Sequence, residues 1–278
     1  MIFEGGNMSI RVFSNNSKII SYFFVLVLFS SAFSGCFSKE EILPEQFGVP
    51  GGLVLACLNS SEFTELVIEV DYEADQKPRP ETLELLVERI SSVCQKQSVT
   101  FDLFLTDFEH EGSWTNEEIR TIGRDTRENN AMNNAQLRFH FLFPSGMHSD
   151  ENVLGVTVDA STVMIFVDRI KESENIIQRP SWENIEAAVA VHELGHLLGL
   201  VNIVYTSNVD HEDSEHPGHS SNEDSVMYWA IESSDFFNIF TGTLPNDFDA
   251  DDKGDLSKLS SAQIQAINQL WYPDGYSY

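Results

Sequence analysis

Two histidines and a glutamate lie within one five-residue stretch of the chain, His192-Glu193-Leu194-Gly195-His196. Residues four apart on a helix project from the same face, so His192 and His196 can direct two imidazole nitrogens at one ion. Zinc suits nitrogen ligands, and a catalytic zinc takes three protein ligands and keeps one position for water. Glu193 would lie beside the ion, where a carboxylate can take a proton from an activated water and return it to a leaving amine. The stretch therefore predicts a zinc site with a general base.

A helix has to position these side chains, and the sequence predicts one between Ser181 and Gly199. Ser181 is a favoured N-cap, and two glutamates follow it near the positive end of the helix dipole. Apolar residues recur at helical spacing up to Leu198, and Gly199 is placed to end the helix. The alternative is an ordinary buried helix, but two histidines and a glutamate would be costly to bury without partners.

The stretch has the H-E-x-x-H arrangement of metal-dependent peptidases, and Gly199 follows His196 by three residues. This spacing resembles the metzincin clan, whose pattern is H-E-x-x-H-x-x-G-x-x-H followed by a turn that contains methionine. Here Asn202 stands where the third histidine is due. An amide oxygen is a weak zinc ligand, so we do not expect Asn202 to coordinate. The third ligand has to come from a later part of the chain.

The segment from His219 to Met227 is similar to the archaemetzincin pattern H-C-x-x-x-x-C-x-M, with Ser220 and Ser225 at both cysteine positions. On this resemblance, Asn202–Gly218 is an insertion, His219 is the third zinc ligand, and Met227 is the methionine of the Met-turn below the zinc. Other candidates for the third ligand stay open, and these are His211, His216 and Asp210.

Other segments agree with the clan. Leu259–Tyr272 resembles the closing helix of matrixin catalytic domains, L-S-x-x-D/Q-I-x-x-I-x-x-L-Y. Val153–Val158 is our candidate for the antiparallel edge strand that holds extended substrate by backbone pairing. The same resemblance implies that Tyr228 and Trp229 wall the pocket for the side chain that follows the cleaved bond, and that they favour apolar groups there.

The rest of the chain predicts a mixed α/β (α+β) domain that carries this site, because strands alternate with helices. Periodicity predicts strands at Leu66–Tyr72, Val99–Leu105, Gln136–Phe143, Val153–Val158 and Val163–Asp168, and further helices at Glu81–Cys94 and Thr115–Glu128. The resemblance implies a metzincin-like catalytic domain with a twisted mixed sheet of about five strands and an antiparallel edge strand. An active-site helix and a C-terminal subdomain that ends in a helix complete the expected fold.

The start of the chain predicts an export signal. Two basic residues precede the apolar stretch Ile19–Phe29, and small residues then lead to Cys36. This order resembles a prokaryotic lipoprotein signal over residues 1–35, with Cys36 as the lipidated first residue of the mature chain. Residues 36–60 would be a tether and 61–278 the zinc protease domain. An uncleaved membrane anchor and plain secretion are the alternatives, and all three place the domain outside the cytoplasm.

The composition limits the classes of partner that the chain can bind. Its 278 residues are 42% apolar, which is enough for a folded core. Lysine and arginine number 16 against 44 acidic residues, and the resulting net charge of −28 repels phosphate backbones. Nucleic acid is therefore excluded as a partner, and any membrane contact is assigned to the lipid anchor or the N-terminal segment. Outside the cell, Cys57 and Cys94 form either a disulfide or two buried thiols.

Alternating carboxylates in Asp247–Asp255 raise the question of a second metal, Ca²⁺. The segment fails the EF-hand pattern, because its glycine is misplaced and Lys258 stands where the twelfth-position glutamate belongs. We therefore expect a solvated acidic loop there and keep calcium as the minor alternative.

These features together predict a zinc endopeptidase outside the cytoplasm that acts on proteins or peptides. Zinc is held by His192, His196 and His219, and Glu193 is the general base and then the acid. One alternative is a noncatalytic zinc-binding surface lipoprotein, a pseudo-peptidase. The other is a peptidase with a glutamate as third zinc ligand, for which the candidates are Glu212, Glu215 and Glu223.

Overall fold

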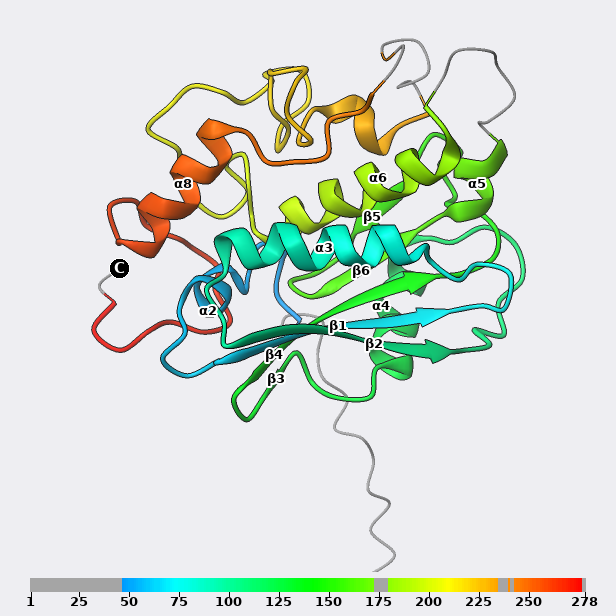
Figure 1. The fold of residues 1–278 in the computed structure, drawn as a ribbon, viewed down its shortest axis with the longest axis horizontal. Helices are drawn as coiled ribbons and strands as arrows, with labels where there is room; N and C mark the ends of the chain where they lie inside the picture. The colour runs from blue at the N-terminus through cyan, green and yellow to red at the C-terminus, as the bar shows by residue number, and fades with distance from the viewer. Residues whose placement is uncertain (1–46, 173–179, 235–239, 241–242, 277–278) are drawn as a thin grey trace, which may run out of the picture. The chain divides into compact units, whose positions relative to one another are not determined.

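The computed structural model describes residues 47–172, 180–234, 240 and 243–276 (Figure 1). The expected signal peptide, the lipidation site Cys36 and the first part of the expected tether lie outside these residues. Within the described ranges, no helix combines the length and the apolar character needed to cross a bilayer.

A mixed sheet forms the centre of the fold. Its strands are β1 (Glu65–Tyr72), β2 (Ser98–Leu105), β3 (Met132–Asn133), β4 (Gln136–Phe143), β5 (Gly155–Thr157) and β6 (Thr162–Ile165). The order is β2-β1-β4-β6-β5, with β3 paired to β4. Neighbouring strands from β2 to β6 are parallel, and the edge strand β5 runs antiparallel to β6. The predicted α/β fold with an antiparallel edge strand is confirmed, with β3 as a short addition.

Helices cover the two faces of the sheet. They are α2 (Val54–Leu58), α3 (Pro80–Val93), α4 (Asn116–Thr126), α5 (Val167–Glu172), α6 (Trp182–Leu197), the 3₁₀ turn η2 (Trp229–Glu232) and α8 (Ala250–Ser260). α3 and α6 pack against each other over one face, and α4 lies on the opposite face (Figure 1). Thr115 caps α4 in a capping box with Glu118, as the sequence predicts.

Alternation along β1 and β4 separates an apolar face from a charged one. Ile68 and Phe139 are fully buried in the core that α3 and α6 cover. The residues between point the other way and are also buried, but they form ion pairs. Arg138 Nη1 lies 3.1 Å from a Glu69 carboxylate oxygen. On the same face, the His140 and Asp71 side chains pair at 2.6 Å. Because these charges are partnered, they can be buried under α4.

The folded unit begins earlier than residue 61, within the expected tether. Val54 and Cys57 of α2 are fully buried, and a disulfide joins Cys57 to Cys94 at the end of α3. Lys96 Nζ donates to the carbonyl oxygen atoms of three residues around the end of α2, Ala56, Asn59 and Phe63. The apolar residues 53–57 therefore belong to the core. Of the two states expected for Cys57 and Cys94, the structure contains the disulfide.

The C-terminal helix expected at Leu259–Tyr272 is wrong. α8 ends at Ser260, and both Ala262 and Asn268 have positive φ angles of 54° and 57°, which a helix does not allow. The segment instead runs beside the start of the folded unit: the Gln269 side chain accepts a hydrogen bond from Leu55 N and donates one to Gly51 O. Long-range hydrogen bonds therefore override a helical pattern of apolar residues.

The strand expected at Val163–Asp168 is also too long. β6 ends at Ile165, and α5 starts at Val167. Val163 in the strand and Ile170 in the helix are both buried. Because buried apolar residues continue from one element into the next, the hydrophobic pattern does not show where the strand ends and the helix begins.

Removing the Cys57–Cys94 disulfide should destabilise the fold. The bond spans 37 residues, and in the chain-entropy description a loop of that length contributes about 4 kcal/mol. We expect the double variant C57A/C94A to lose about this much free energy of unfolding in urea, and reduced wild-type protein to unfold at a similar urea concentration. Superimposable curves for oxidised and reduced wild-type protein would contradict the assignment.

Candidate metal centre

Helix α6 carries His192 and His196 on its buried side, one turn apart. The helix ends at Leu197, and Gly199 follows in the left-handed region with φ 67°, as its predicted role as a helix stop requires. Gly195 lies between the histidines, and a Cβ added there would overlap the Met227 sulfur atom. Glycine therefore leaves the space that the end of the Met227 side chain occupies against the helix.

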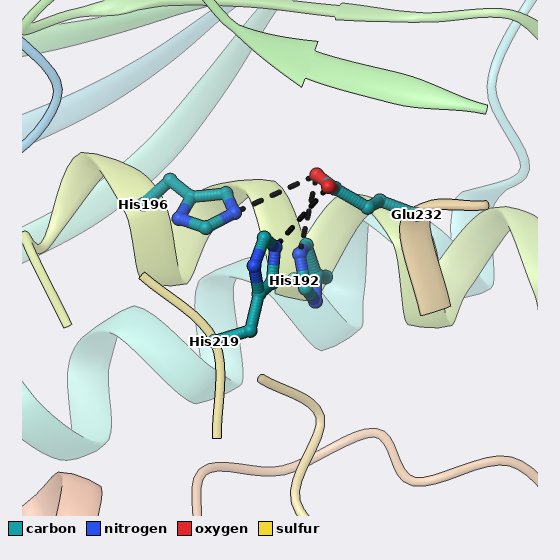
Figure 2. Close-up of side chains that lie close together, drawn as sticks. All are labelled: His192, His196, His219 and Glu232. Atoms are coloured by element: carbon teal, nitrogen blue, oxygen red, sulfur yellow. Dashed lines mark ion pairs between the residues drawn. The ribbon is translucent and has the colours of Figure 1, made fainter. Parts of the chain in front are cut away.

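His219 reaches the same place from the loop that returns after the insertion. Its ring centroid lies 5.2 Å from that of His192 and 5.0 Å from that of His196, and the two helix histidines are 4.7 Å apart. Figure 2 shows the three rings turned toward a common point. The structure thus brings together the three histidines that the sequence predicts as zinc ligands.

Hydrogen bonding leaves the ring nitrogens of this group free for a cation. His192 Nδ1 lies 2.7 Å from the carbonyl oxygen of Val226, an acceptor, so this nitrogen donates the hydrogen bond and Nε2 is the ring nitrogen that faces the rest of the group. Among the described residues, the buried Nε2 atoms of His192 and His219 have no hydrogen-bond partner. Burial lowers the pKa of His196 to about 4, which keeps this ring neutral at physiological pH. Burial lowers the pKa of His219, but the Glu232 carboxylate outweighs it and raises that pKa above its usual value. Converging imidazole nitrogens are donors that zinc prefers.

Glu232, which the sequence analysis missed, completes the group. Its carboxylate oxygens lie 3.5 Å from His192 Nε2, 3.6 Å from His196 Nε2 and 3.1 Å from His219 Nε2 (Figure 2). These four side chains could hold a metal ion, with all ligand atoms within 4.8 Å of one another. Burial raises the pKa of Glu232, but the three imidazoles outweigh it and hold that pKa well below its usual range. Glu232 follows Met227 by five residues and belongs to no motif, so only chain folding reveals it.

Glu193 is fully buried beside the histidines and is held by the edge strand β5. Thr157 Oγ1 donates to Glu193 Oε2 at 2.7 Å, while Glu193 Oε1 has no partner within the described ranges. Burial and the charge of Glu232 raise the pKa of Glu193 well above its usual range. One oxygen is thus fixed and the other is free to exchange a proton.

The other histidines of the insertion lie apart from this group. His211 is buried with its Nε2 3.1 Å from an Asp255 carboxylate oxygen. His216 stacks on Trp229 with ring centroids 4.2 Å apart. Asp210 is exposed. None of these three expected alternatives belongs to the four-residue group.

The glutamates considered as third ligand are placed elsewhere. Glu212 accepts hydrogen bonds from Asn202 Nδ2 and from Gly218 N, and so ties the two ends of the insertion together. Glu215 and Glu223 are exposed. The glutamate that does lie at the histidines is Glu232, and it lies there in addition to His219.

Met227 lies under the group, and α8 supports it from below. Met227 N donates to Ser225 Oγ, whose hydroxyl donates to Asp252 of α8 at 2.9 Å. The solvated acidic loop expected at Asp247–Asp255 is wrong, because Asp249 caps α8 and both Asp252 and Asp255 are buried. Tyr228 and Trp229 follow Met227 and are half-buried. Their role as pocket walls stays a prediction.

The chain is similar in structure to the archaemetzincin from Methanopyrus kandleri, with 12% identity and a TM-score of 0.44, over 70% of this chain and 94% of that one. It is also similar to the archaemetzincin from Archaeoglobus fulgidus complexed with malonate, with 12% identity and a TM-score of 0.38, over 69% and 99% of the two chains. No family model and no curated protein matches the sequence. Both likenesses are distant, so the chemistry of the site is inferred from its own geometry.

Replacing His219 should remove much more zinc than replacing its neighbours in the same loop. We expect H219A to lose most bound zinc when the protein is dialysed and measured by atomic absorption, because one of the converging nitrogens is gone. H211A and H216A are the matched controls and should keep their zinc. Loss of zinc from H211A with retention in H219A would show that the third ligand is misassigned.

Asp252 should give the protein a characteristic pH dependence. Burial, together with the charge of Asp249, raises the pKa of Asp252 from 3.8 to about 6. The folded state therefore binds this proton more tightly than the unfolded state, and stability falls as pH rises from about 4 to about 6.

Compared with D252N, which cannot titrate, the wild-type protein should lose about 3 kcal/mol of unfolding free energy across this interval. The exposed neighbour Asp251 supplies the control, since D251N should keep the wild-type slope. Parallel curves for wild type and D252N between pH 4 and pH 6 would contradict the assignment.

Proposed function

We propose that this chain is a zinc-dependent endopeptidase, with His192, His196 and His219 as zinc ligands and Glu193 as general base and acid. The observation that carries the proposal is the convergence of three imidazoles, two buried on a helix and one half-buried on a distant loop, beside a carboxylate with one free oxygen. The donor set fits zinc, because two buried Nε2 atoms lack partners and the Val226 carbonyl fixes one tautomer.

Zinc bound to these three rings would polarise the carbonyl of a peptide bond and make a nearby water molecule more acidic. The protein's part in the reaction falls to Glu193. As the water oxygen attacks the carbonyl carbon, its proton passes to Glu193 Oε1. When the carbon–nitrogen bond breaks, that proton passes to the leaving amine. Thr157 holds the other oxygen throughout, so the carboxylate keeps its orientation.

The substrate class follows from the position of Glu193 against an edge strand. β5 pairs with β6 on one side, and Thr157 of β5 contacts Glu193 directly. An extended peptide that adds to a strand edge is recognised through its backbone, which is suited to proteins or peptides of varied sequence. We extend the proposal to location outside the cytoplasm, supported by the lipoprotein-like signal that ends at Cys36.

One observation favours a second candidate, a noncatalytic zinc-binding surface protein. Glu232 lies at the histidines, and zinc sites with four protein ligands are usually structural. Glu193 speaks against this candidate, because a structural site needs no buried carboxylate with a free oxygen next to it.

The variant E193Q should separate the two candidates. We expect its zinc content to match wild type, since Glu193 is not a ligand, and its hydrolysis of a quenched peptide to fall by about 10²–10⁴-fold. E183Q, in the first turn of the same helix, is the control and should keep both properties. Chelator should abolish wild-type hydrolysis. Unchanged turnover in E193Q would refute the role of Glu193 as general base. Absence of chelator-sensitive hydrolysis by the wild-type protein would favour the noncatalytic candidate.

A further inference from the structure

We propose that Glu232 is a fourth protein ligand that closes the zinc site at rest, and that an extended peptide opens the site by displacing the segment that carries Glu232. This inference rests on the proposed zinc site and adds a device that controls access to it. Three observations carry it: the distances at the site, the backbone pairing of residues 232–234, and the partial exposure of the Glu232 side chain.

The distances place the Glu232 carboxylate next to all three histidine Nε2 atoms, near the fourth position of a tetrahedral site. With zinc–nitrogen and zinc–oxygen bonds of about 2.0–2.1 Å, the ligand atoms of a tetrahedral site lie about 3.3 Å apart. Glu232 Oε2 lies 3.5 Å from His192 Nε2 and 3.6 Å from His196 Nε2, close to that value, and the other oxygen, Oε1, lies 3.1 Å from His219 Nε2. The contact to His219 is short, yet His219 Nε2 has no hydrogen-bond partner, so its alignment is not that of a hydrogen bond. A cation shared by the four side chains accounts for this arrangement.

The backbone around Glu232 pairs with the chain that leads into β5. Leu154 N donates to Glu232 O, and Ser234 N donates to Asn152 O, both at 2.8 Å. Val153 and Ser233 form an antiparallel bridge between these hydrogen bonds. Residues 232–234 thus act as a short added strand that continues the edge of β5 and directs a carboxylate at the histidines. A peptide that pairs with the same backbone has to replace this strand, and Glu232 then leaves with it.

Glu232 is also the ligand that can leave most readily. Its side chain is 31% exposed, whereas those of His192 and His219 are 0% and 13% exposed. The histidines on α6 are fixed by the helix, while Glu232 ends a 3₁₀ turn, η2, at the start of the paired segment 232–234. Release is therefore an equilibrium, and the wild-type protein should hydrolyse peptides slowly rather than not at all.

The isosteric variant E232Q tests the inference through the metal, without reference to activity. An amide oxygen is a weak ligand, so zinc affinity measured by chelator competition should fall at least about tenfold. In the cobalt-substituted protein, azide should bind at least about tenfold more tightly to E232Q, because the fourth position is open, and the visible spectrum should change accordingly. E223Q removes one exposed carboxylate from the same part of the chain and should leave zinc and azide affinities at wild-type values.

A second variant keeps all ligands and weakens only the pairing. Asn152 Oδ1 accepts a hydrogen bond from Ser234 Oγ at 3.0 Å, and N152A removes it. We expect azide affinity of the cobalt form of N152A to rise above wild type while zinc binding by the histidines persists. If E232Q does not fold, as judged by thermal melting of the metal-free protein, the azide affinity of N152A decides. Wild-type azide affinity in every variant that folds would overturn the inference.

Peptide hydrolysis distinguishes this inference from the proposed function. If E232Q opens the site to azide and hydrolyses a quenched peptide faster than wild type, both stand. If it opens the site to azide without any hydrolysis, Glu232 is the fourth ligand and the peptidase proposal fails. If hydrolysis by wild type and E232Q is equal and azide affinity is also unchanged, the site is open at rest, and the inference fails while the peptidase proposal stands.

Discussion

The close contact between Gly195 and the Met227 side chain is the constraint on which the rest of the site depends. It requires a residue without Cβ in the middle of a histidine-bearing helical turn. With that space available, the returning segment passes under α6, and the Val226 carbonyl meets His192 Nδ1. His219 precedes this segment and is thereby placed opposite the two helix histidines. The glycine thus lets the Met227 side chain lie directly against the helical turn that carries the two histidines.

The Met227 segment is itself held by buried charge. Ser225 connects it to Asp252 of α8, and Asp255 of the same helix pairs with His211 of the insertion. Burying two carboxylates without partners would destabilise the fold, and the hydrogen bonds to Ser225 and His211 offset that cost while they fix the position of the segment. The acidic stretch that could have been a solvated loop is instead a structural support. A metal site needs such support, because its ligands must stay in place when no ion is bound.

Two carboxylates, Glu193 and Glu232, lie at the candidate metal centre. The two carboxylates have different surroundings. Glu193 has an oxygen without a hydrogen-bond partner among the described residues, and Glu232 faces three imidazoles. Their negative charges oppose each other in a buried site, and a cation at the histidines offsets this repulsion. Glu232 comes from a segment that pairs with the chain leading into the edge strand β5, so the proposed substrate edge and the proposed metal site share one piece of backbone.

The sequence alone determined the local features, because each follows from spacing within a few residues. The helix with His192, Glu193 and His196 is of this kind, as are β1, β4 and the capping box of α4. The tertiary structure decided every feature that depends on contacts between residues distant in the sequence. Glu232 belongs to no motif, and Thr157 binds Glu193, which lies 36 positions later in the chain. It also overrode the helical pattern after Leu259, because hydrogen bonds to residues 51–55 stabilise an irregular path there more than a helix would. Periodicity reports which side of a segment is apolar, and long-range contacts decide what that side packs against.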